Sequence, residues 1–240
     1  MGSACGLHDP PAGSGGAGMI ERGKFIVLDG IDGCGKSTQT RLLTDWLRGM
    51  DISARSTFEP GGTVLGAKLR QLLLHDNIEM SPLAEMMVFC ADRAEHLETV
   101  VVPYLQAGAC VVCDRFSAAT YAYQVSGSEM NYSIQAFLDA DHAARCALWQ
   151  GTGQWYPDLM LILDLDDPGE GMRRKGKRPD KIEGRGAVYH QRVAEGFRFY
   201  GRGHLGGAAT VISAAGTVEE VHARIVEQVK PLVLTSVGAS

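Results

Sequence analysis

From Lys24 onward, short apolar runs alternate with stretches of helical periodicity. Five short segments are predicted strands, at 25–28, 53–58, 110–113, 159–163 and 210–212. Continuous apolar runs of this length are typical of strands that are buried on both faces. Strands that alternate with helices predict an α/β fold, in which helices cover both faces of a parallel sheet.

Residues at characteristic positions mark where the predicted helices begin and end. The first helix follows the first strand and carries its apolar residues within 42–47. Ser81 and Pro82 begin a long helix as the N-cap and the first helical residue, and Gly108 ends it. The last helix begins with Thr-Val-Glu-Glu at 217–220, which is a capping box.

The first 23 residues differ from the rest of the chain. They lack apolar periodicity and include a stretch rich in glycine and proline at 10–18. Such a segment buries too little surface to order itself, so we predict a disordered leader at 1–23 and one folded domain at 24–234. Met19 is either the natural start or the junction with an added leader, and the residues leave both readings open.

Charge and hydropathy exclude several classes of function. The chain has 23 Lys and Arg against 28 Asp and Glu, a net charge of −5. A nucleic-acid-binding protein usually carries a basic excess, so we expect no nucleic-acid partner. No stretch approaches the ~20 apolar residues of a membrane span. The N-terminus also lacks the layout of a secretory signal, so we expect a cytoplasmic protein without a membrane partner.

Cys110 and Cys113 form a C-x-x-C pattern, which in other contexts binds metal or carries redox chemistry. Here the pair lies in a predicted buried strand, where positions three apart point to opposite faces. No second pair lies at ligand spacing. We therefore predict ordinary buried thiols.

The strongest motif lies at 30–37, where Gly-Ile-Asp-Gly-Cys-Gly-Lys-Ser matches G-x-x-x-x-G-K-[ST] at every fixed position. It follows a predicted strand and begins a predicted helix, which is the context that a phosphate-binding loop requires. Lys36 is predicted to contact the β- and γ-phosphates of ATP, and the Ser37 hydroxyl to coordinate Mg²⁺. The predicted ATP-binding residues are Gly30, Ile31, Asp32, Gly33, Cys34, Gly35, Lys36, Ser37 and Thr38.

Four further stretches carry a resemblance to a known family. They are Glu-Pro-Gly-Gly-Thr at 59–63, Phe-Cys-Ala-Asp-Arg at 89–93, Asp-Arg at 114–115 with Ala-Tyr-Gln at 122–124, and a basic run at 173–178 followed by Asp-Lys-Ile-Glu at 180–183. On these stretches the chain resembles thymidylate kinases from Lys24 to about Lys230. The resemblance implies a P-loop NTPase fold with a five-stranded parallel sheet flanked by helices and a mobile lid, here at about 170–186. It also implies a homodimer that transfers the γ-phosphate of ATP to dTMP, giving dTDP for dTTP biosynthesis.

Two pairs of residues make chemical sense on the acceptor side. Phe89 and Arg93 project from one helical face, where a ring beside a guanidinium can stack on a base and donate to its carbonyl edge. The resemblance implies that they bind thymine; core packing and a surface ion pair are the alternatives. Asp114 and Arg115 end a strand at the sheet edge where ligands bind. The resemblance implies a place near Mg²⁺ for Asp114 and the acceptor phosphate for Arg115, and a structural ion pair is the alternative.

The resemblance implies roles for five more substrate-binding residues. Asp32 touches the 3′-hydroxyl, Arg70 lies on the substrate side, and Thr120 contacts the base. Tyr123 and Gln124 lie against the deoxyribose and thymine, and a tyrosine placed there excludes a 2′-hydroxyl.

Phosphoryl transfer needs cations over the moving phosphoryl group. Positions 33 and 34 of the phosphate loop carry no arginine, so the resemblance assigns this role to the lid. Arg174 is the first candidate and Arg178 the second, although a basic run is often only a solvated face. With Lys36 and Arg115, they are the predicted catalytic residues.

The chain departs from the family at two places. Related sequences usually have arginine just before Glu59, where it helps to hold the dTMP phosphate, and here that residue is Phe58. Arg70 and Arg115 would then hold the phosphate. The lid is also about two residues shorter than common bacterial forms. Weaker dTMP affinity or altered substrate choice would follow.

Two other functions remain open from the residues. A deoxynucleoside kinase shares the fold and could use Glu59 as the base for a 5′-hydroxyl. A non-catalytic nucleotide-binding homologue is the second alternative, and only the missing arginine at Phe58 favours it.

Overall fold

The computed structural model describes residues 22–128, 134–146, 155–175, 180–203, 205 and 209–234. The described strands are β1 (Phe25–Gly30), β2 (Ala54–Phe58), β3 (Cys110–Asp114), β4 (Leu159–Asp164) and β5 (Thr210–Ser213). The described α-helices are α1 (Lys36–Gly49), α2 (Val64–Leu74), α3 (Pro82–His96), α4 (Val102–Gln106), α5 (Ser117–Thr120), α6 (Ile134–Arg145), α7 (Pro168–Lys175), α8 (Ala187–Gly201) and α9 (Val218–Leu234). Two π-helical segments, η1 (Leu97–Val101) and η2 (Tyr121–Ser126), and a 3₁₀ turn, η4 (Glu183–Arg185), complete them.

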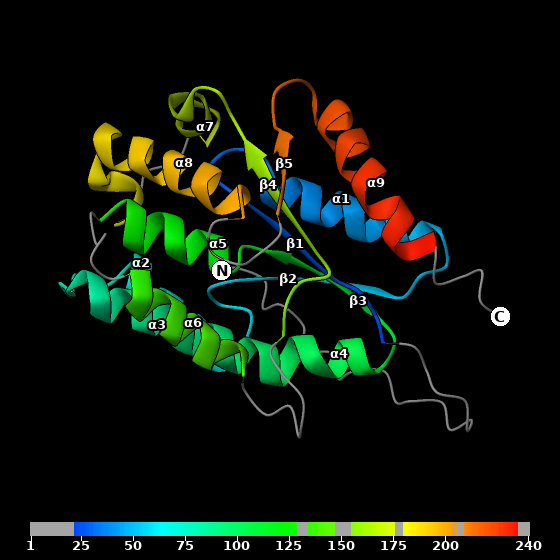
Figure 1. The fold of residues 1–240 in the computed structure, drawn as a ribbon, viewed down its shortest axis with the longest axis horizontal. Coiled ribbons are helices and arrows are strands. Elements are labelled where there is room, and N and C mark those ends of the chain that lie inside the picture. The colour runs from blue at the N-terminus through cyan, green and yellow to red at the C-terminus, as the bar shows by residue number, and fades with distance from the viewer. Residues whose placement is uncertain are drawn as a thin grey trace.

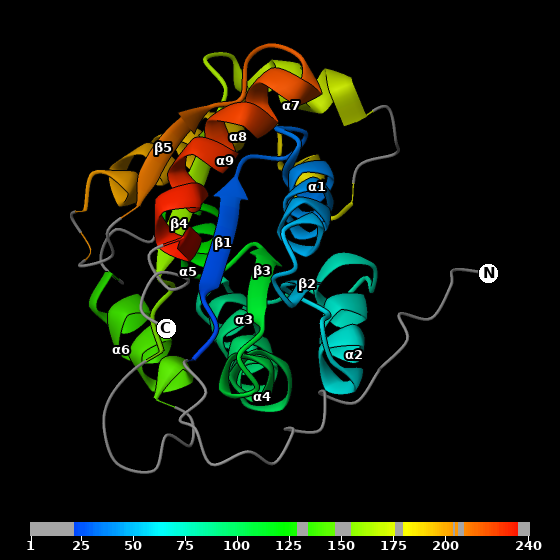
Figure 2. The ribbon, with the colours of Figure 1, turned by 90° about the vertical axis from the view of Figure 1, so that its right-hand side faces the viewer.

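The five strands form one parallel sheet in the order β2-β3-β1-β4-β5, with β1 at its centre (Figure 2). Helices α1 and α9 pack side by side on one face, while α4, α5 and α8 cover the other (Figure 1). Every residue of β1 and β3 is buried because both faces are covered. The predicted α/β fold with a five-stranded parallel sheet is confirmed.

The predicted helix ends are also confirmed. The Ser81 hydroxyl accepts from the amide of Ala84, and the helix that it begins continues through α3, η1 and α4. Thr217 and Glu220 form both bonds of the capping box, at 2.8 and 3.2 Å. These local bonds satisfy amides that have no partner within the helix.

The predicted leader lies almost entirely outside the described residues, because the description begins at Arg22. Arg22 donates to Asp158 over 2.6 Å, and the Gly23 amide donates to the carbonyl of Leu105 over 2.9 Å. These two residues therefore belong with the folded domain. Among the described helices, none combines the length and the apolar character that a membrane crossing demands.

The carboxyl ends of β1, β2 and β3 lie at one edge of the sheet, and Figure 2 shows α7 at the same end. The loops after these strands are the phosphate loop, the Glu-Pro-Gly-Gly segment and the Asp-Arg segment. The parallel topology thus brings three distant motifs together, at the edge where open α/β sheets bind ligands.

Candidate active site

A cavity of about 670 Å³ lies at this edge of the sheet. Its lining includes most of the predicted site: Asp32, Gly33, Gly35, Lys36, Ser37, Thr38, Arg70, Phe89, Arg93, Asp114, Arg115, Thr120, Tyr123 and Gln124. The cavity is large enough for a small-molecule ligand. The structure therefore gathers predicted site residues as far apart in sequence as Asp32 and Gln124 around one space.

The phosphate loop depends on its own backbone. Gly33 has a φ of 74°, in the left-handed region that favours glycine, and a Cβ there would lie 1.8 Å from the carbonyl oxygen of Gly171 in α7. The Lys36 ammonium donates to the carbonyls of Gly30 and Ile31 at 2.9 and 2.7 Å. The loop thus wraps around the side chain of Lys36, and α7 packs against the loop.

Ser37 and Asp114 form the predicted metal-binding pair. The Ser37 hydroxyl donates to Oδ2 of Asp114 over 2.5 Å, which joins the start of α1 to the end of β3. Oδ1 of Asp114 is buried and has no hydrogen-bond partner among the described residues. A hydroxyl and a carboxylate at the phosphate loop are oxygen donors that suit Mg²⁺. The pair therefore fits the predicted ion.

Arg115, Asp32 and Tyr123 form a second cluster. Arg115 has a φ of 78°, and its guanidinium donates to Oδ1 of Asp32 over 2.5 Å. The Tyr123 hydroxyl donates to Oδ2 over 2.7 Å. Burial, together with the charge of Asp32, raises the pKa of the Tyr123 phenol well above its ordinary value, so the phenol remains a donor. The acceptor side is thereby tied to the phosphate loop through Asp32.

Arg70 faces the cavity near Arg115. Its guanidinium donates to the carbonyl of Pro60 over 2.8 Å and lies over the Phe58 ring at 5.7 Å. Burial, followed by the positive charge of Arg115, lowers the pKa of Arg70. Two guanidinium groups that repel each other across a cavity favour an anion between them. Phe58 is 37% exposed and lines the same cavity, so it is not a core residue.

Arg93 has more protein partners than the sequence suggested. Its guanidinium donates to Glu59 at 3.1 Å, to Asp141 at 2.9 Å and to the Thr120 hydroxyl at 2.8 Å. Arg93 and Asp141 are almost completely buried. Arg93 is therefore a structural centre of the acceptor side as well as a lining residue, whereas neighbouring Phe89 is only partly buried.

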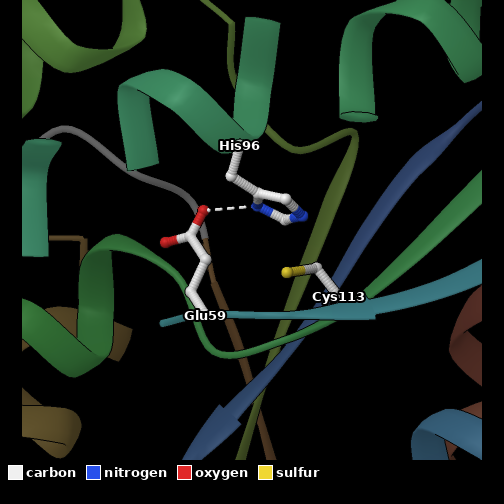
Figure 3. A group of neighbouring side chains, drawn as sticks. All are labelled: Glu59, His96 and Cys113. Atoms are coloured by element: carbon white, nitrogen blue, oxygen red, sulfur yellow. Dashed lines mark hydrogen bonds and ion pairs between the residues drawn. The ribbon is translucent and has the colours of Figure 1, made fainter. Parts of the chain in front are cut away.

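Glu59, His96 and Cys113 lie close enough together to suggest a metal site (Figure 3). However, His96 Nδ1 is bonded to Glu59 at 2.9 Å, and its Nε2 is bonded to Thr57 at 2.6 Å. Burial raises the pKa of the Cys113 thiol well above its ordinary value, and the thiol donates to the carbonyl of Arg115. Both imidazole nitrogens and the thiol are thus already engaged, so we assign the cluster to the hydrogen-bonded core. Cys110 is likewise buried in β3.

Three buried carboxylates that support the site were not predicted from the sequence, namely Asp29, Glu85 and Asp141. Asp29 accepts from the amides of Gly30, Phe116 and Ala119, and so fixes the Asp-Arg loop to the phosphate loop. Burial raises its pKa to about 6, although Arg115 and Lys36 oppose the shift. An acidic residue at the end of an otherwise apolar strand was the signal that could have identified it.

The predicted lid is only partly described. Its first part is α7, in which Arg173 is exposed and pairs with Asp167 at 2.7 Å. Arg174 belongs to this helix, and Arg178 lies outside the described residues. After the gap, Asp180, Ile182 and Glu183 line the cavity, so the far end of the lid segment returns to the site.

Comparisons with known proteins agree on one family. A family model described as thymidylate kinase matches residues 28–225. The thymidylate kinase of Synechococcus sp. (strain WH7803) is 40% identical over 213 residues, covering 85% of this chain and 93% of that protein. The thymidylate kinase of Parasynechococcus marenigrum (strain WH8102) is 44% identical over 182 residues, covering 73% of this chain and 83% of that protein.

A solved structure gives the same result. The crystal structure of thymidylate kinase from Ehrlichia chaffeensis matches with a TM-score of 0.67 and 27% sequence identity. The match covers 87% of this chain and 99% of that chain. The fold and the sequence therefore indicate the same family.

Proposed function

The chain belongs to the thymidylate kinase family, and on this premise we propose that the cavity binds dTMP beside ATP and transfers the γ-phosphate between them. The products are dTDP and ADP, in the synthesis of dTTP. One observation carries the assignment of the site: Arg70 and Arg115 face the same cavity as Lys36 and Ser37. A cationic acceptor position thus lies beside a phosphate-donor loop.

On the donor side, the amides of the phosphate loop and the start of α1 receive the phosphates of ATP. Lys36 exchanges the carbonyls of Gly30 and Ile31 for phosphate oxygens, because a charged acceptor is stronger than a neutral one. Ser37 and Asp114 would hold Mg²⁺, which neutralises phosphate charge when it is bound.

On the acceptor side, Arg70 and Arg115 hold the phosphate of dTMP and orient it toward the donor loop. In this proposal Asp32 accepts from the 3′-hydroxyl, and the ring of Tyr123, whose hydroxyl donates to Asp32, excludes a 2′-hydroxyl. Phe89 stacks on the base. Arg93 and Thr120, already bonded to each other, face its O4 edge.

Further parts of the proposal rest on the family resemblance. Arg174 or Arg178 in the lid supplies positive charge over the moving phosphoryl group. We further propose a homodimer that acts in the cytoplasm.

The deoxynucleoside kinase alternative needs Glu59 as a free base. Instead, the Glu59 carboxylate is buried and bonded to both Arg93 and His96. A carboxylate held by two donors is a poor proton acceptor, so its environment favours a structural role.

The test is ADP release in a coupled assay with ATP and, in turn, dTMP, dUMP and thymidine. We expect the largest kcat/KM with dTMP. Turnover with thymidine alone would support the deoxynucleoside kinase. ATP binding without ADP release from any acceptor would support the non-catalytic homologue.

A further inference from the structure

The side chain of Gln124 is held in one orientation by a carboxylate. Gln124 lines the cavity and is 1% exposed, and its Nε2 donates to Oε1 of Glu85 over 3.0 Å. An ionised carboxylate only accepts hydrogen bonds, so the amide must turn its NH₂ group toward Glu85. Its carbonyl oxygen, Oε1, makes no hydrogen bond to the described residues. That oxygen is available as an acceptor for a ligand in the cavity.

Glu85 is in turn held by a residue at the end of the lid. Glu85 is 2% exposed, and its other oxygen, Oε2, accepts from Nη2 of Arg185. Arg185 belongs to η4, shortly after the lid arginines in sequence. It also donates to the Tyr189 hydroxyl at 3.4 Å, and that hydroxyl donates to the carbonyl of Tyr123 at 2.8 Å. Arg185 is therefore linked to Gln124 through Glu85 and to Tyr123 through Tyr189.

We propose that Arg185 and Glu85 are positioning residues that determine base selectivity by fixing the Gln124 amide. The inference rests on the proposed function, because it concerns the base of the acceptor nucleotide. A carbonyl oxygen presented to the base favours a donor at N3, which thymine and uracil have. It disfavours cytosine, whose N3 is an acceptor, because two acceptors would face each other without a proton.

Arg185 is needed because it holds the carboxylate of Glu85 by the oxygen that does not contact Gln124. Without the guanidinium, Oε2 of the buried Glu85 side chain loses this partner, and the carboxylate is free to turn away from Gln124. The Gln124 amide can then turn its NH₂ group toward the base. The cavity would present a donor, which cytosine N3 accepts. Arg185 thus acts on base selectivity through Glu85 and Gln124, although it does not line the cavity.

The test compares kcat/KM for dTMP and dCMP in four variants of the full chain. Arg185→Met removes the charge but keeps much of the side-chain length. Arg185→Lys restores the charge. Glu85→Gln replaces the obligate acceptor by an amide that can donate or accept. Arg202→Met is the matched control, because Arg202 is exposed at the end of α8.

We expect Arg185→Met and Glu85→Gln to lower the dTMP-to-dCMP selectivity roughly 10- to 100-fold, the effect of one mismatched hydrogen bond in a buried site. Arg185→Lys and Arg202→Met should retain the wild-type ratio within about threefold. Equal losses of kcat/KM for both nucleotides in Arg185→Met and Glu85→Gln would show a merely structural role and overturn the inference. Melting temperatures identify any variant that does not fold. If either Arg185→Met or Glu85→Gln does not fold, the other of these two variants tests the inference. If the wild-type chain does not phosphorylate dTMP, the proposed function is wrong. That result differs from an unchanged dTMP-to-dCMP ratio in the variants, which would contradict only the inference about Arg185 and Glu85.

Discussion

The donor and acceptor sides of the cavity are built in different ways. The phosphate loop is one continuous segment, and its lysine bonds to carbonyls five and six residues away. The acceptor side draws on the loop after β2 and on α3, α5 and α6, which are joined by the buried side chains of Glu59, Arg93 and Asp141. Backbone geometry supports one side, and a network of charged side chains supports the other. Substitutions should therefore affect the two sides differently.

The largest effect is expected at Lys36. Lys36→Ala removes a charge that balances the transferring phosphoryl group, so kcat at saturating ATP should fall about 10²- to 10³-fold. The fold should remain intact, although the loss of the two bonds to the carbonyls of Gly30 and Ile31 should lower the melting temperature slightly. Lys68→Ala, on the exposed face of α2, is the control and should retain full turnover. An unchanged kcat in Lys36→Ala would refute the donor-side assignment.

Arg93→Ala should affect both stability and substrate binding. Removing the guanidinium leaves Glu59 and Asp141 buried without their partner, which costs about 3–5 kcal/mol of unfolding free energy. Among molecules that remain folded, KM for dTMP should rise roughly 10- to 150-fold, and far more than KM for ATP.

Asp141→Asn separates these two effects, because Asp141 supports Arg93 without lining the cavity. It should lower the unfolding free energy and change KM for dTMP less than Arg93→Ala does. A stable Arg93→Ala enzyme with normal dTMP affinity would contradict both roles.

Asp92 provides a test by pH. It accepts from the Gly61 amide at 3.0 Å, and burial, assisted by the charge of Glu59, raises its pKa from 3.8 to about 6. The folded state thus binds a proton more tightly than the unfolded state, and this contribution to stability is lost as pH rises from about 4 to 6. Asp92→Asn should remove this loss of stability with rising pH.

Chemical unfolding of Asp92→Asn and wild type at pH 4.5 and 7.5 measures this effect. The variant should gain about 1–3 kcal/mol relative to wild type between the two pH values. Asp139→Asn, exposed in α6, should show no such gain. A parallel pH dependence in Asp92→Asn and wild type would contradict the assignment.

The smallest effect is expected at Phe58. This residue is partly exposed in the cavity, so Phe58→Arg should not bury a charge, and the unfolding free energy should change by about 0.5 kcal/mol or less. A third cation beside Arg70 and Arg115 should lower KM for dTMP severalfold. Steady-state kinetics beside thermal melting checks both expectations, and a large loss of stability would show that Phe58 supports the fold.

The same contrast explains what the sequence could predict. The phosphate loop, the capping box at Thr217 and the Ser81 N-cap depend on residues within a few positions, so local patterns reveal them. The central strands β1 and β3 were predictable because burial on both faces requires continuous apolar runs. Helices α2, α5, α6 and α8 were not predicted.

The supporting partners of the site could not be inferred in this way. Asp141 is 48 residues from Arg93, and Arg185 is 100 residues from Glu85, and no short-range pattern links either pair. Phe89 and Arg93 were identified through a motif, but the dense bonding of Arg93 depends on how α3, α5 and α6 pack together.

The central claim is that Arg70 and Arg115 bind the acceptor phosphate at a position distinct from that of the ATP phosphates, although Arg115 is bonded to Asp32 of the ATP loop. Arg70 tests it most directly, because its guanidinium contacts Pro60 and Phe58, which lie outside that loop. Calorimetric titration of Arg70→Met with dTMP and with ATP, beside Lys68→Met as the control from the same helix, measures the two affinities independently. We predict that Kd for dTMP rises about 10- to 150-fold while Kd for ATP stays within about twofold. Equal weakening of both ligands, or unchanged dTMP affinity, would contradict the account.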